Sequence, residues 1–303
     1  MLLPDAVSAT EGRTLSARTG LADPLVLRPP LEPVHYEAVI CWESYAGSDT
    51  YQTSTLTKQV ALSGHVLAEG RVLLDFRTSP PVLTKPQDLE SLETMALRLA
   101  TLYAQVVVQA GPTGAFEALG NHAGLLQTWE LLAHSLRAST TTEDRITPTL
   151  LDFLGQQLQD PAKVLLSLQH DYLYAALVPA WFAQPLGGAA PPARTRAFSQ
   201  FFDKLPLVFA EQVDVRPAAS GEPVTVACRG TLDAARTDVA AIGALMARAV
   251  GRPADAPQTP HFHYEATHVL DAATGLPERV DLTVYGRLAE HYNKQYTLTL
   301  TRV

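Results

Sequence analysis

Cysteine is nearly absent from this sequence, which has only Cys41 and Cys228 among 303 residues. Small secreted domains with little core depend on several disulfides, and structural zinc sites need closely spaced ligands. Two cysteines so far apart supply neither pattern. We exclude a disulfide framework and a zinc knuckle, and we interpret both thiols as small buried or half-buried side chains of predicted strands.

Positive charge is also scarce. The chain has 23 lysine and arginine residues against 31 aspartate and glutamate residues, which gives a formal net charge of −8. It contains no run of basic residues, so it exerts no long-range attraction on nucleic-acid phosphates or anionic lipid. We expect an acidic protein that does not bind nucleic acid.

Targeting signals and long apolar runs are missing as well. The first residues, MLLPD, contain no basic segment followed by an apolar one, as a secretory signal requires. The uncharged stretch 172–193 is interrupted by prolines, whereas a membrane-spanning helix needs about 20 apolar residues. We therefore expect no membrane span and a cytoplasmic protein.

The common catalytic motifs do not occur. We find no Gly-x-Ser-x-Gly elbow, no Ser-x-x-Lys pair and no phosphate-binding loop with its Lys-Ser/Thr. The carboxylates are scattered, without a pair in an apolar frame. These absences favour a non-enzymatic protein and predict no cofactor.

Alternation of apolar and polar residues is the strongest signal that is present. It runs from Val34 to Phe76 and again from His261 to Val303, where Asp271 and Gly275 belong to a turn. A period of two is typical of half-buried strands. Each stretch therefore predicts an antiparallel meander with one buried face, which other parts of the chain must cover.

Helical spacing occupies the middle of the chain. Thr147-Pro148 and Asp160-Pro161 each combine a capping side chain with proline at the first helical position. Together with a helix capped by Asn121, they predict a helical insertion over about 121–182. The order of elements predicts an α+β fold, with a largely antiparallel curved sheet, helices packed on one face and the helical insertion at its centre.

The same patterns predict the domain organisation. Residues 1–32 lack periodicity and are expected to form an extended or poorly ordered N-terminal arm. Residues 33–303 are expected to form one α+β domain, because strands flank the helical insertion on both sides. Within it, 184–195 is the predicted linker, since it holds two glycines followed by two prolines.

Aromatic residues are dense on both sides of the predicted linker. We consider two interpretations: an apolar pocket or partner-binding patch beside the sheet, and ordinary core. The candidate binding residues are Tyr172, Tyr174, Trp181, Phe182, Phe198 and Phe202.

Two histidine patterns suggest metal chemistry. On a strand, His261, His263 and Glu265 lie on one face at intervals of about 6.6 Å, a spacing at which two histidines can share a metal ion. The alternative is a solvated strand face. His170-Asp171, on a predicted helix, resembles the paired His-Asp of metal-dependent phosphohydrolases, although that family is an all-helical bundle.

These observations lead to one functional hypothesis and one alternative. The hypothesis is a non-enzymatic binding or assembly protein that engages a protein partner, a second copy of itself or an apolar ligand. The alternative is a metal-dependent enzyme that uses the His261, His263 and Glu265 face.

Overall fold

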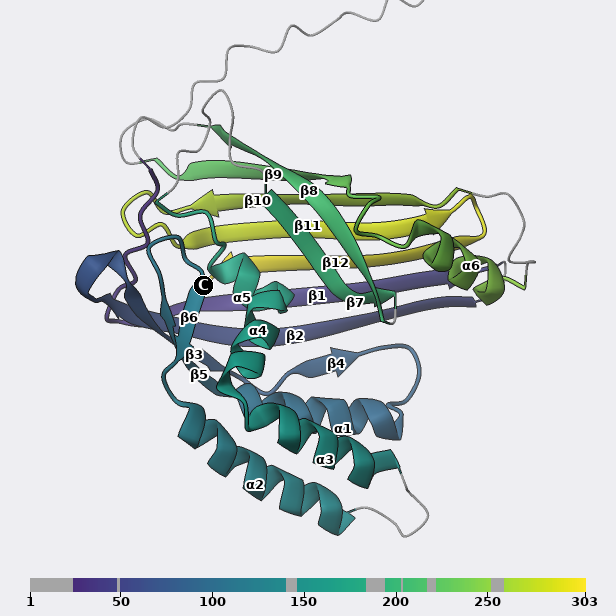
Figure 1. Ribbon diagram of the computed structural model, residues 1–303, viewed down its shortest axis with the longest axis horizontal. Coiled ribbons are helices and arrows are strands. Elements are labelled where there is room, and N and C mark those ends of the chain that lie inside the picture. The colour runs from purple at the N-terminus through teal and green to yellow at the C-terminus, as the bar shows by residue number, and fades with distance from the viewer. Residues whose placement is uncertain are drawn as a thin grey trace, which may run out of the picture.

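Figure 1 shows one broad sheet whose helices lie on one side of it and beyond one of its edges. The structure is a computed structural model. It describes residues 24–47, 50–139, 146–183, 194–202, 204–216, 222–251 and 259–303.

Twelve strands form this sheet within the described residues. Their order is β6-β5-β3-β2-β1-β12-β11-β10-β9-β8-β7, with β4 paired to β2, and every pairing is antiparallel. The predicted α+β fold with an antiparallel sheet is confirmed. The strands are β1 (Val34–Ala46), β2 (Thr50–Val66), β3 (Val72–Thr78), β4 (Val82–Thr84), β5 (Gln105–Ala110), β6 (Phe116–Leu119), β7 (Arg194–Phe202), β8 (Leu205–Arg216), β9 (Val224–Leu232), β10 (His261–Leu270), β11 (Pro277–Leu288) and β12 (Tyr292–Arg302).

The two meanders belong to the same sheet. They meet where β1 pairs with β12, so that Ala38 lies opposite Leu300. The first and the last described strands are therefore neighbours near the middle of the sheet, and the helical segment is inserted between the two meanders in sequence.

The sheet is strongly curved. Neighbouring strands are about 4.8 Å apart, so strands five steps apart in a flat sheet would be separated by about 24 Å. β7 and β12 are five steps apart, yet the rings of Phe202 and Tyr292 have centroids only 6.4 Å apart. Phe198 of β7 likewise approaches Tyr264 of β10, at 4.9 Å. The β7 edge thus curls back over the sheet, and the face that it covers is concave.

The concave face holds the main core. Tyr36, Tyr264 and Leu282 are almost fully buried there, in the register that the alternation predicts. Trp42 has the same register in β1 but is only partly buried. The opposite face of these strands carries mainly polar side chains, so it can remain in contact with water.

The helices lie on the concave side and beyond the β3–β5 edge. In Figure 1, α4 and α5 cross the concave face, whereas α6 lies near the other end of the long strands. The helices are α1 (Ser91–Ala100), α2 (His122–Ser139), α3 (Ile146–Leu158), α4 (Pro161–His170), α5 (Tyr172–Leu177) and α6 (Val239–Ala249), with short 3-10 turns η1 (Ala68–Gly70) and η2 (Thr101–Tyr103). Among the described residues, no helix is both long enough and apolar enough to cross a membrane.

Asp160 begins α4 as its sequence predicts, with its carboxylate accepting the N–H of Ala162 at 3.0 Å and Pro161 in the first turn. α5 follows after a single residue, Asp171. The carboxylate of Asp171 accepts the N–H groups of Leu173 and Tyr174, at 2.8 and 3.3 Å. The chain therefore turns sharply between α4 and α5 without leaving these N–H groups unpaired.

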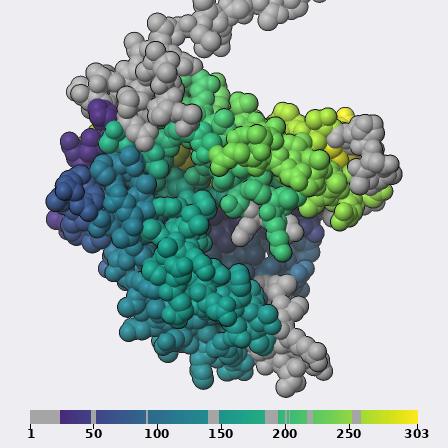
Figure 2. Space-filling model, in the orientation of Figure 1, coloured from purple at the N-terminus to yellow at the C-terminus, as the bar shows by residue number. Residues whose placement is uncertain are grey.

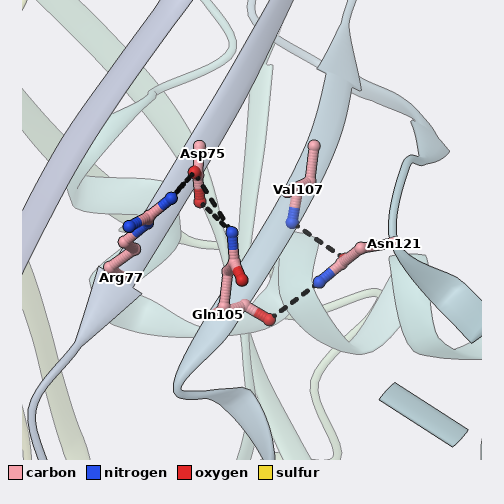
Figure 3. A network of polar contacts seen from close by, with 5 residues as sticks. All are labelled: Asp75, Arg77, Gln105, Val107 and Asn121. Carbon is pink, nitrogen blue, oxygen red and sulfur yellow. Dashed lines mark hydrogen bonds and ion pairs between the residues drawn. The ribbon is translucent and has the colours of Figure 1, made fainter. Parts of the chain in front are cut away.

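Asn121 performs a different role from the predicted cap. Its side chain accepts the N–H of Val107 at 2.9 Å and donates to the carbonyl of Gln105 at 3.0 Å, so it extends the hydrogen bonding of β5 (Figure 3). Asp75 of β3 accepts hydrogen bonds from Arg77 and from Gln105. This network attaches the start of α2 to the edge of the sheet.

The predicted arm and linker are only partly described. Residues 1–23 lie outside the described residues, but Leu25 and Leu27 are buried and the N–H of Arg28 donates to the carbonyl of Thr274. Of the predicted linker, 184–193 lies outside the described residues. At its end, Arg194 and Thr195 belong to β7 and pair with β8.

Candidate functional site

A cavity lies between α5 and the concave face of the sheet. It consists of two adjoining hollows of about 400 and 310 Å³, which share the lining residues Trp42, Asp171, Tyr172 and Tyr296. We call it the α5 cavity. In Figure 2 the surface is hollowed between the teal helices and the green strands, with the purple and blue of β1 and β2 visible at the bottom.

Aromatic rings form the walls of the α5 cavity. The ring of Tyr296 on β12 meets the ring of Trp42 at 5.8 Å and the ring of Tyr172 at 4.7 Å, both edge to face. Phe201 of β7 lines the end near α4. Trp42 and Tyr172 are only partly buried, so their rings offer apolar surface that the protein itself does not cover.

Asp171 places a carboxylate in this aromatic cavity. The carboxyl group of Asp171 is surrounded by protein atoms, and the resulting loss of hydration raises its pKa. Hydrogen bonds from the N–H groups of Leu173 and Tyr174 act against this rise, as do the positive charges of Lys58 and Arg196. The side chain is nevertheless exposed, because it borders the cavity. A ligand in the α5 cavity would therefore meet this carboxyl group directly.

Two lysines also line the α5 cavity. Lys58 projects from β2 onto the concave face, where burial lowers its pKa and the neighbouring Asp171 partly restores it. Lys294 of β12 lies over the rings of Phe201 and Phe202, at 5.6 and 5.7 Å. The cavity therefore combines aromatic walls with charged and polar groups, and the hollow of about 310 Å³ is the more apolar of the two.

Substitution of Asp171 by asparagine should remove one component of the pH dependence of stability. The pKa of Asp171 is higher in the folded protein than in the unfolded chain, where it is about 3.8. Between these two pKa values the folded protein holds a proton that the unfolded chain has lost, so the wild-type becomes less stable as the pH rises through this window. Asparagine keeps the acceptor oxygen for α5 and does not titrate. The stability of Asp171→Asn relative to wild-type should therefore increase with pH in that window, as measured by urea unfolding from pH 3 to 8. A difference independent of pH would show that the carboxyl pKa is not raised.

Most of the aromatic residues predicted to bind a ligand or partner are core residues. Their rings pack against strands on the concave side, because β7 curls over the sheet. Tyr172 and Tyr174 line the α5 cavity, and Tyr172 is the partly exposed member of the set. Trp181, Phe182, Phe198 and Phe202 are each at most 2% exposed, so they belong to the core, and a role for them in binding stays a prediction.

The sequence contained one signal for the site that the predictions missed. Lys58 interrupts the apolar register of β2, and a cation on a buried face needs a partner or a cavity. Its partner Asp171 is far away in sequence and was interpreted only through its neighbour His170. Trp42 and Tyr296 have the apolar register of their strands, and alternation gives no indication that part of this face is left uncovered.

The predicted metal-binding residues lie on the convex, polar face of β10. The ring of His263 stacks on that of Tyr285 at 4.9 Å, and its Nε2 atom is 3.4 Å from the Glu265 carboxylate. His261 lies 5.8 Å from the same tyrosine ring. The described part of the chain contains no group of three or more histidine, cysteine, aspartate or glutamate residues that could hold a metal ion. The metal hypothesis stays a prediction.

Comparison with known proteins yields only distant similarities. No family model and no curated protein matches the chain. It is similar to a solved structure of lipid–protein interactions in lipovitellin, at 7% identity and a TM-score of 0.38, over 90% of this chain but only 25% of that one. Structures of MucB with MucA, one of them from Pseudomonas aeruginosa, match at 8% and 9% identity, with TM-scores of 0.11 and 0.10 over 88–89% of this chain and 89% of theirs. None of these TM-scores is high enough to assign a shared fold.

Proposed function

We propose that this protein is a non-enzymatic binding protein that holds a small amphiphilic ligand in the α5 cavity. The observation that carries the proposal is a half-open cavity between α5 and the sheet with partly exposed aromatic walls. Ligand sites are typically concave and mainly apolar, with volumes of about 300–1,000 Å³, and the two hollows of about 400 and 310 Å³ fall in that range.

The chemistry of the walls suggests how such a ligand is oriented. Its apolar body would lie against Trp42 and Tyr172, whose partly exposed rings gain by leaving water, and beside the buried ring of Tyr296. Its polar end would lie at Asp171, which can accept a hydrogen bond as the carboxylate or donate one in the protonated form. Lys58 beside Asp171 favours a neutral polar end, because a cation or an anion would each meet a like charge.

A neutral apolar dye provides the test. N-phenyl-1-naphthylamine fluoresces strongly in apolar surroundings and should bind the wild-type saturably, with quenching of tryptophan emission from Trp42. Ser167→Trp places a ring in the cavity and should weaken binding about tenfold, which corresponds to about 1.4 kcal/mol.

Leu166→Trp is the matched control, since Leu166 is the neighbouring residue of α4 and is 53% exposed. It should bind the dye as the wild-type does. Absence of saturable binding to the wild-type, or equal weakening by the two variants, would contradict the proposal.

A protein partner and self-association, both expected from the sequence, stay predictions. Four of the six aromatic residues proposed for such contacts are buried in the core, so they offer no surface to a partner. A metal-dependent reaction at His261, His263 and Glu265 also stays a prediction.

A further inference from the structure

A second, smaller pocket lies on the other side of α5. It has a volume of about 130 Å³ and is enclosed by the C-terminal end of α5 and by strands β7, β8, β10 and β11. Ala180 and Thr195, which are exposed, form part of its wall and connect it to the surface. We call it the β7 pocket. It shares no lining residue with the α5 cavity.

Four buried nitrogen atoms of the β7 pocket have no hydrogen-bond partner among the described residues. Native proteins pair the great majority of their buried polar groups, so four unpaired atoms in one place call for an explanation. Trp181 and His268 are only 2% and 4% exposed. The atoms are Trp181 Nε1, Arg194 Nη1, Arg196 Nε and His268 Nδ1.

These side chains lie close together. The ring of Trp181 meets the ring of His268 at 4.5 Å, and the guanidinium carbon of Arg194 lies 5.8 Å from the centre of the Trp181 ring. Arg196 is close enough to His268 to lower its pKa, although burial is the larger cause. Indole and guanidinium nitrogens can only donate, so a group that pairs with them must be rich in acceptors.

The side chains that line the β7 pocket include two guanidinium groups and one carboxylate. Glu211 lies 3.4 Å from Arg194 Nε and also accepts the hydroxyl proton of Tyr264 at 2.8 Å. Arg196 also interacts with the Asp171 carboxylate, which lies outside this pocket. His268 adds no charge, because its pKa is lowered to about 3. The unpaired N–H groups of the arginines and of Trp181 are therefore the feature that favours an acceptor-rich anion here.

We propose that the β7 pocket binds a small oxyanion, such as a carboxylate or phosphate group, through Arg194, Arg196 and the indole N–H of Trp181. A guanidinium group presents parallel N–H donors that match the oxygen spacing of carboxylate and phosphate. Water could pair with the same donors, since the volume exceeds the roughly 30 Å³ of one water molecule. An oxyanion, however, offers several acceptor oxygens and a negative charge to the three donors at once, which gives stronger hydrogen bonds than water does.

The indole N–H of Trp181 reports on this pocket directly. The chain has three tryptophans, so a protein labelled with 15N-tryptophan gives three indole signals, which Trp181→Phe and Trp42→Phe assign. Sodium acetate or sodium phosphate, compared with sodium chloride at equal ionic strength, should shift the Trp181 signal saturably. The signals of Trp42 in the α5 cavity and of Trp129 in α2 should not move. A Trp181 signal that does not respond to either anion would overturn the proposal, and so would a larger shift at Trp42.

Variants separate specific binding from general electrostatic attraction. Arg196→Gln removes one guanidinium and should raise the acetate Kd at least about tenfold, as expected for loss of a charged hydrogen bond. Arg287→Gln is the control, because Arg287 lies on the convex face over Tyr285, and it should bind like the wild-type. If Arg196→Gln does not fold, by circular dichroism, Arg194→Gln replaces it. Equal weakening by the control and the pocket variant would overturn the proposal.

The source of the oxyanion is distinguished by chain length. Octanoate carries the same carboxylate as acetate, with a hydrocarbon tail. Binding at least tenfold tighter than acetate, read from the Trp181 signal and not from that of Trp42, would show that the oxyanion is the head of a larger ligand, whereas equal affinities would show that the pocket takes free small anions.

Discussion

Replacement of Trp181 and Phe182 by serine should unfold the protein. The two residues are 2% and 0% exposed. Removal of a large aromatic side chain from a core costs about 3–5 kcal/mol, and a single domain is stable by only about 5–15 kcal/mol. Phe182 also packs very closely, since a Cβ atom built on Gly114 or Gly275 would lie 2.8 or 3.1 Å from its ring. The two losses together approach or exceed the total stability.

Urea unfolding followed by circular dichroism measures this effect. The double variant should show no folded baseline, or a midpoint far below that of the wild-type. Phe153→Ser is the control, because the ring of Phe153 on α3 is 55% exposed, and its stability should change by less than about 1 kcal/mol. A double variant that melts near the wild-type temperature would show that the two rings are accessible, as the interpretation of a surface patch required.

Acid should destabilise the protein through His268. Its pKa is lowered from 6.5 to about 3, first by burial and then by Arg196. Between these values the unfolded chain binds a proton that the folded chain excludes, so stability falls as the pH decreases from 6.5 to about 3. A shift of this size corresponds to about 5 kcal/mol. Glu211 and Tyr264 line the β7 pocket together with His268. The Glu211 carboxylate interacts with Arg194 and accepts the hydroxyl proton of Tyr264, so it is not paired with the imidazole.

The variant His268→Leu isolates this contribution, because leucine is apolar and does not titrate. Its free energy of unfolding should decrease less than that of the wild-type between pH 6.5 and pH 4. Other groups titrate in both proteins, so the difference between the two curves is the relevant quantity. Parallel curves would show that His268 can be protonated in the folded state, and that its imidazole is less enclosed than its 4% exposure indicates.

Much of the sheet could be predicted from the sequence because its long strands have one solvent-exposed face and one buried face. Tyr36 and Tyr264 lie on the buried face, as their positions in the alternation predict. Curvature could not be predicted in this way, since a period of two describes a strand and not the angle between strands. The contact between Phe202 and Tyr292 depends on the accumulated twist of the five steps between their strands.

The candidate sites were less predictable than the sheet. Each site brings together side chains that are distant in sequence. Lys58 and Asp171 line the α5 cavity, and Arg194 and His268 line the β7 pocket. Single-sequence patterns reveal which face a residue occupies, but not which residues of other elements face it. The arginines of β7 were not predicted as site residues, because Arg194 fell within the predicted linker and Arg196 directly followed it.

The pairing of β1 with β12 has a consequence for biosynthesis. Because Ala38 lies opposite Leu300, one edge of β1 stays unpaired during synthesis until β12 has been translated. The first meander can form early, but until then it carries unpaired backbone groups and an apolar face, both of which favour aggregation. β12 is therefore the strand that joins the two meanders into one sheet.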